Sequence, residues 1–275
     1  MKKPIYLVPV DFSPVSIEAI TTAIALAKRN NGSVLAIHIV AKKSERDTAR
    51  TQFKQIIQGL QTEDQELIET KVLIGGIYED IAKAAEIIGA SLIVMGTHGA
   101  KGMQKLFGSH ALRLVSSTGT PFVILQEGGS LTDIKTIVMP FNFERESIQI
   151  ANFAGFIAKQ FDATIHLVGY HDNDEWLRGK SHANQLVVRK QFEEHNVKYE
   201  IANLPKKSSV YIDALLQYTD TVNADLIASS FFVDTFLPTM NSFIQALIEN
   251  DRQIPLLTAN AEELTISSGY SFMTI

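Results

Sequence analysis

The chain has 275 residues, a formal net charge of −5, 45% hydrophobic and 20% charged residues, and no cysteine. This composition is typical of a globular protein long enough for two domains, and it excludes disulfides, cysteine-ligated metal centres and thiol catalysis. The lack of a basic block argues against a nucleic-acid surface, and no apolar segment approaches the roughly 20 residues that span a bilayer.

The first residues are basic and then apolar, which superficially resembles a secretion signal. Asp11 interrupts the apolar run, however, and no small-residue cleavage site follows it. We therefore expect a cytoplasmic protein with no membrane partner.

The first half of the chain alternates short apolar runs with amphipathic segments. The first run ends at Asp11, where Ser13 can cap a helix and Pro14 is tolerated in its first turn. Such alternation predicts a parallel, doubly wound α/β sheet with right-handed crossovers. We expect strands at about 5–10, 33–40, 68–73, 91–96 and 121–126, and helices at about 14–29, 44–62, 77–88 and 107–117.

The same pattern returns about 131 residues later, which indicates a duplication. Matching positions are Pro9 with Pro140, Asp11 with Asn142, Tyr78 with Tyr211, and Ser109 with Ser242, as the offset drifts from 131 to 133. A chance alignment would not keep nearly one offset over so many elements. We therefore expect two tandem Rossmann-like domains at 1–128 and 133–262, followed by a tail at 263–275.

The most informative segment is Gly96-Thr97-His98-Gly99, followed by Gly108-Ser109. It stands between an apolar run and an amphipathic run, so its glycines would let backbone N–H groups face an anion at the positive end of a helix. It is neither a Walker loop nor the dinucleotide fingerprint. Taken alone, it is equally typical of a tight strand-to-helix connection.

Ligands of doubly wound sheets lie outside the carboxyl ends of the strands, at the switch point. Asp11 and Gly96 both stand at such ends, so one crevice can use both. The Asp11 carboxylate can accept a hydrogen bond from an adenine amine or a ribose hydroxyl there, or it can merely cap the first helix.

No catalytic residue or metal site is expected. His38 is interpreted as a core or edge residue and His98 as a loop residue, because neither has a paired carboxylate or ligand spacing. Ser13 lacks the neighbours of a nucleophile. A further cluster is interpreted as a solvated loop rather than a metal site: His166, His171, Asp172 and Asp174.

Together, Pro9-Val10-Asp11, the glycine segment and the last strand at 121–124 resemble the universal stress protein family. The resemblance covers nearly the whole chain as two adenine nucleotide alpha hydrolase-like domains, specific in the first half and degenerate in the second. It implies ATP, with or without Mg²⁺, in the first domain. The implied contacts are Pro9, Val10, Asp11 and Val40 around adenine and ribose, and Met95, Gly96, Gly99, Gly108, Ser109 and His110 around ribose and phosphates.

Two departures from the family pattern bear on this site. Eight residues separate Gly99 from Gly108 where the family has nine, so the phosphate loop could close differently. In the second copy Asn142 replaces Asp11, and the segment 229–233, with two phenylalanines, replaces the glycine turn. We expect no ATP in the second domain, because no glycine there permits close backbone approach.

The resemblance also implies association through the last strand of each domain, so that the chain forms its own pseudo-dimer and covers two sheet edges. A further homodimer and a protein partner are open. The expected role is an ATP-binding sensor or regulator of the stress response, at most a weak ATPase. The alternatives are a slow ATPase or adenylating enzyme of the same fold, and a scaffold or small-ligand module without nucleotide.

Overall fold

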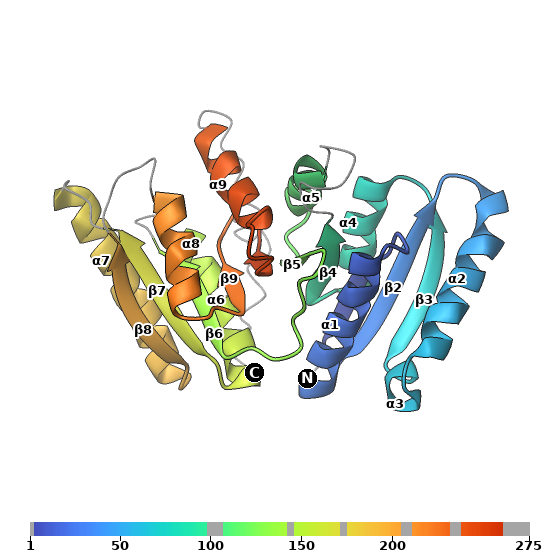
Figure 1. Cartoon of the computed structure of the whole chain (residues 1–275), viewed down its shortest axis with the longest axis horizontal. Coiled ribbons are helices and arrows are strands. Elements are labelled where there is room, and N and C mark those ends of the chain that lie inside the picture. Colours follow the sequence, from blue (N-terminus) through green and yellow to red (C-terminus); the bar gives the residue numbers. More distant parts are fainter. Residues whose placement is uncertain are drawn as a thin grey trace. The chain divides into compact units, whose positions relative to one another are not determined.

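The computed structural model divides the chain into two compact units, residues 1–132 and 133–275. The structure describes residues 3–97, 107–141, 146–170, 175–204, 211–231 and 238–260. Strands and helices alternate in both units (Figure 1). The predicted parallel α/β fold is confirmed.

The described part of the first unit contains a parallel sheet in the order β3-β2-β1-β4-β5. The strands are β1 (Ile5–Pro9), β2 (Ser33–Val40), β3 (Ile68–Ile74), β4 (Leu92–Thr97) and β5 (Phe122–Gln126). The helices are α1 (Pro14–Asn30), α2 (Arg46–Gly59), α3 (Thr62–Gln65), α4 (Ile77–Ile88) and α5 (Phe107–Val115), with a 3₁₀ turn at Lys43–Glu45.

The second unit repeats this parallel order as β10-β9-β6-β7-β8 in its described residues. Its strands are β6 (Thr136–Pro140), β7 (Thr164–Tyr170), β8 (Lys198–Leu204), β9 (Leu226–Ala228) and β10 (Leu256–Thr258). Its helices are α6 (Glu146–Phe161), α7 (Glu175–Glu194), α8 (Tyr211–Thr221) and α9 (Pro238–Ile248). The two copies also share a register, because Pro9 pairs with Ile37 and Pro140 pairs with Val168.

The order of the strands fixes a switch point at β1. The chain runs from β1 to β2 and β3 on one side of the sheet, and then to β4 and β5 on the other side. Right-handed crossovers in opposite directions place α1 and α2 on one face and α4 and α5 on the other. The connections that follow β1 and β4 therefore leave the sheet on opposite faces. Open parallel sheets form a crevice between two such connections, at the carboxyl ends of the strands.

Two helical boundaries illustrate how local residues set the elements. Ser13 caps α1, with Pro14 in its first turn, and Asn31 ends the helix in the left-handed conformation with φ of 54°. The Gly32 N–H then donates to the Ala27 carbonyl, which completes a common C-terminal motif. The single helix expected at 44–62 is instead broken after Gly59, because Leu60 takes an extended backbone.

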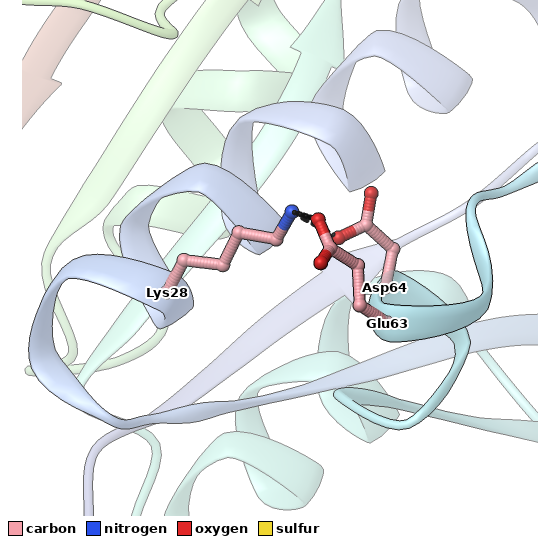
Figure 2. Close-up of polar contacts among 3 residues, drawn as sticks. All are labelled: Lys28, Glu63 and Asp64. Carbon is pink, nitrogen blue, oxygen red and sulfur yellow. Dashed lines mark hydrogen bonds and ion pairs between the residues drawn. The ribbon is translucent and has the colours of Figure 1, made fainter.

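An ion-pair cluster links the last turn of α1 to α3. The Lys28 ammonium lies 2.9 Å from a Glu63 carboxylate oxygen and 2.5 Å from an Asp64 carboxylate oxygen (Figure 2). Hydrogen bonds to Asp64 and then to Glu63 raise the pKa of Lys28. The stabilisation is thus fully present below the ordinary lysine pKa and is lost as the pH rises through the folded-state value. Because the ammonium is exposed, we expect salt to screen the pair.

The buried Tyr6 makes the stability of the first unit depend on pH in the alkaline range. The residue is 2% exposed, and its hydroxyl accepts a hydrogen bond from the Asn30 amide. Burial raises the pKa of Tyr6 from 10.0 to about 12. Between these two values the unfolded chain loses this proton and the folded chain keeps it, so stability falls as the pH rises.

We therefore expect the wild type to lose about 1 kcal/mol more stability between pH 9 and pH 11 than the Tyr6→Phe variant does. Denaturant unfolding of both proteins at the two pH values measures this difference. Equal losses would mean that Tyr6 ionises alike in the folded and unfolded chains.

Candidate functional site

A pocket of about 270 Å³ opens at the carboxyl ends of β1, β2 and β4, in the first unit. The strands and the turn after β1 contribute Pro9, Val10, Asp11, Ile37, His38, Ile39, Met95, Gly96 and Thr97, and the helices contribute Ser16, Ile77, Tyr78, Ile81, Ala111 and Leu114. Most of these side chains are apolar, with a few polar groups among them. Such a lining suits a flat, largely apolar ligand that is oriented by a few hydrogen bonds.

The turn after β1 holds Asp11 at the rim of this pocket. The Asp11 carboxylate accepts hydrogen bonds from the Ser13 N–H at 3.0 Å and from the Ser13 hydroxyl at 2.5 Å. Ser13 in turn caps α1 through its own side chain. The helix-capping alternative for Asp11 therefore has a structural basis, and it leaves the carboxylate exposed beside the pocket.

His38 joins the wall of the pocket to this turn. Its Nδ1 atom lies 2.6 Å from the Val10 carbonyl oxygen. Because a carbonyl oxygen only accepts hydrogen bonds, the Nδ1–H group of His38 is the donor in this contact. The expectation of a satisfied edge histidine is thus correct for the hydrogen bond, but it missed that His38 lines the pocket.

Phe12 connects the same turn to α2. Its ring centroid lies 4.5 Å from that of His38 and 5.1 Å from that of Phe53, which is buried on α2. Its backbone has φ of 66°, in the left-handed region that non-glycine residues rarely adopt. The ring contacts therefore offset backbone strain next to the pocket.

Replacing Phe12 should separate these two effects. Both Phe12→Ala and Phe12→Gly lose the ring contacts, but only glycine relieves the left-handed backbone. We expect Phe12→Gly to be more stable than Phe12→Ala by about 1 kcal/mol in denaturant unfolding. An alanine variant at least as stable as the glycine variant would contradict the strain.

The structure gathers only some of the residues that the resemblance implies. Pro9, Val10, Asp11, Met95 and Gly96 line the pocket together. Gly99 lies outside the described residues. Gly108, Ser109 and His110 lie in the first described turn of α5, the helix whose Ala111 and Leu114 line the pocket.

Val40 does not line the pocket, whereas Ile39 does. Val40 is the last residue of β2 and is buried, and its carbonyl accepts a hydrogen bond from the Gly75 N–H at the β3 end. The sequence prediction also missed Tyr78 as a residue of the pocket. The only sign of it in the sequence was that this tyrosine recurs as Tyr211.

Gly96 lies within β4 rather than in the turn after it, because it pairs with Leu125 and Thr97 pairs with Gln126. A Cβ atom at Gly96 would lie 2.7 Å from the backbone of Val15 on α1. Glycine is therefore required here because α1 approaches the strand closely.

The second unit differs at the corresponding strand ends. After β9, Phe231 is 3% exposed and its N–H donates to the Ala259 carbonyl, so the chain continues as extended backbone. Asn142 and Phe232 lie outside the described residues. His166 contacts the Tyr218 hydroxyl at 2.9 Å, and its expected neighbours His171, Asp172 and Asp174 are not described.

In the described part of the chain, no three acidic, histidine or cysteine side chains gather as metal ligands would. In the same residues, every helix is too short or too polar to pass through a bilayer.

Fold and pocket define a doubly wound α/β protein with a ligand-sized pocket at the switch point of its first unit. The family model described as "Universal stress protein family" matches residues 5–126. Universal stress protein MJ0531 of Methanocaldococcus jannaschii is 31% identical in an alignment of 137 residues that covers 44% of this chain and 81% of that protein. The chain belongs to the universal stress protein family.

Solved structures extend the likeness in fold to both units. A universal stress protein from Archaeoglobus fulgidus DSM 4304 aligns over 95% of this chain and 100% of that chain, with a TM-score of 0.71 and 17% identity. A functionally unknown protein from Pseudomonas aeruginosa PAO1 aligns over 98% of each chain, with a TM-score of 0.66 and 13% identity. At these identities the two likenesses establish the fold alone.

Proposed function

We propose that the first unit binds ATP or a related adenine nucleotide, and that the protein acts in the stress response as a cytoplasmic sensor or regulator. The observation that carries the proposal is the pocket itself, which lies at the switch point and combines apolar walls with the Asp11 carboxylate at its rim. Membership of the family supports the regulatory role.

The residues of the pocket fit an adenosine. Ile37, Met95 and Leu114 give apolar surface for a flat base, and Asp11 is an acceptor for an amine or a hydroxyl. Gly108 and Ser109, which the resemblance assigns to phosphates, lie in the first described turn of α5, the helix that supplies Ala111 and Leu114 to the pocket. Backbone N–H groups near these two residues would receive the negative charge of a bound phosphate.

A pocket with so much apolar surface also favours a second candidate, a small-molecule site that takes an aromatic ligand without phosphates. The two candidates differ in one respect. A nucleotide needs the region around Gly108 and Ser109, whereas an uncharged aromatic ligand needs only the walls.

The decisive experiment is to purify the full chain, denature it, and identify any released small molecule by mass spectrometry. Titration calorimetry should then compare ATP, adenosine and inorganic triphosphate on emptied protein. We expect ATP to bind more tightly than adenosine and triphosphate not to bind measurably. Equal affinity for ATP and adenosine would favour the second candidate, and no heat with either would contradict the binding of an adenine nucleotide. Phosphate release over hours under the same conditions would instead favour a slow ATPase.

A further inference from the structure

Tyr78 forms part of the pocket wall and is held from outside by a cation. It lies in the first turn of α4 and lines the pocket. The guanidinium carbon of Arg113, an exposed residue of α5, lies 4.3 Å from the centroid of the Tyr78 ring. This distance is that of a cation–π contact, so Arg113 fixes the ring from the neighbouring helix (Figure 1).

The duplicate of this tyrosine takes a different position. Tyr211, in the first described turn of α8, stacks on Phe243 of α9 with a centroid separation of 6.1 Å and an interplanar angle of 15°. Its hydroxyl donates a hydrogen bond to the Val168 carbonyl at 3.3 Å. At the offset that relates Ser109 to Ser242, the residue corresponding to Arg113 is Ala246, so this copy lacks the arginine.

The acceptor of the Tyr211 hydroxyl corresponds to a residue of the pocket in the first unit. Val168 pairs with Pro140 as Ile37 pairs with Pro9. The Val168 carbonyl accepts from the Phe141 N–H at 2.8 Å, and the Ile37 carbonyl accepts from the Val10 N–H at the same distance. Ile37 lines the pocket. Tyr211 therefore contacts a strand end whose counterpart in the first unit, at Ile37, lines the pocket.

We infer that Arg113 is a positioning residue that holds Tyr78 as the wall of the pocket and keeps its ring off the strand end at Ile37. Loss of the cation would favour the position that Tyr211 takes in the second unit. The pocket would then be partly filled by its own side chain, and a ligand would have to displace the ring. The inference deepens the proposed function and rests on it for the binding measurement.

A double-mutant cycle on the full chain tests this inference. ATP dissociation constants are measured by calorimetry for the wild type, Arg113→Ala, Tyr78→Ala and the double variant. We expect Arg113→Ala to weaken binding roughly two- to tenfold when Tyr78 is present, because the open pocket is less populated. With alanine at position 78, removal of Arg113 should change the constant less than about twofold. Arg50→Ala, which removes an exposed arginine of α2 paired with Asp47, is the matched control.

Two outcomes of the cycle would overturn the inference. An equal loss in both backgrounds would mean that Arg113 acts on the ligand or on the packing of α4 against α5. No loss in either background would mean that the cation does not control the ring.

A second measurement needs no nucleotide. In protein labelled with 3-fluorotyrosine, the ¹⁹F resonance of Tyr78, assigned with Tyr78→Phe, should shift in Arg113→Ala and not in Arg50→Ala. If the wild type binds no ATP, the proposed function fails and this shift still tests the inference. An unshifted resonance would overturn it.

Discussion

Replacing Gly96 by alanine is expected to destabilise the first unit by about 1–3 kcal/mol and to lower its thermal midpoint by several degrees. The added Cβ would lie 2.7 Å from the carbonyl carbon and oxygen of Val15, and backbone atoms cannot yield as a flexible side chain can. Helix α1 would have to move away from β4, a strand that it contacts extensively. Because Gly96 and Ser16 both line the pocket, the same shift should weaken ligand binding.

Gly59→Ala is the matched control for this substitution. Gly59 is the last residue of α2, and a Cβ atom there would meet nothing within 4 Å. Alanine favours helix over glycine, so we expect this variant to be as stable as the wild type or slightly more stable. Denaturant unfolding followed by circular dichroism measures both variants. A Gly96→Ala protein as stable as Gly59→Ala would mean that α1 and β4 are not tightly packed at this point.

Replacing Asp11 by asparagine is expected to reduce ATP affinity about five- to tenfold while stability changes by less than about 0.5 kcal/mol. Asparagine keeps the side-chain oxygen that accepts from the Ser13 N–H and hydroxyl, so the turn before α1 is preserved. It removes the negative charge, and a hydrogen bond from a ligand amine or hydroxyl to a neutral oxygen is weaker than one to a carboxylate. The substitution also reproduces the residue of the second copy, Asn142.

Calorimetry with ATP and thermal unfolding should be compared for Asp11→Asn and Asp47→Asn. Asp47 is an exposed carboxylate of α2 that pairs with Arg50 and does not line the pocket, so its variant controls for the loss of one negative charge. Unchanged ATP affinity in Asp11→Asn would assign Asp11 to helix capping alone. A large loss of stability would instead mean that the charge itself stabilises the turn.

The elements of the first unit were predicted closely because each is marked by local chemistry. Ser13 and Pro14 start α1, and Asn31 and Gly32 end it. The apolar runs of the inner strands β1 and β4 are continuous because both faces of the sheet are covered. The break after Gly59 was not predicted, although Leu60 takes an extended backbone there. Helical periodicity alone continues across such a break.

The candidate site was predicted less completely than the fold. Asp11 and Met95 follow or end strands in the sequence, so the switch-point rule located them. His38 lines the pocket because β2 extends beyond the end of β1, and Tyr78 lines it because α4 begins beside the pocket. Neither fact has a local sequence signal. Val40, which the resemblance implied, is not among the residues that line the pocket.

By itself, the sequence determined the parallel α/β fold, its duplication and its family, because these depend on hydrophobic period, turn residues and motifs that recur along the chain. Only the tertiary structure decided how particular residues are used. Gly96 allows α1 to pack closely on β4. Tyr78 faces a guanidinium in the first copy, whereas its counterpart Tyr211 stacks on an aromatic ring in the second. Such uses depend on contacts between residues far apart in the chain, and local patterns do not encode the distances that decide them.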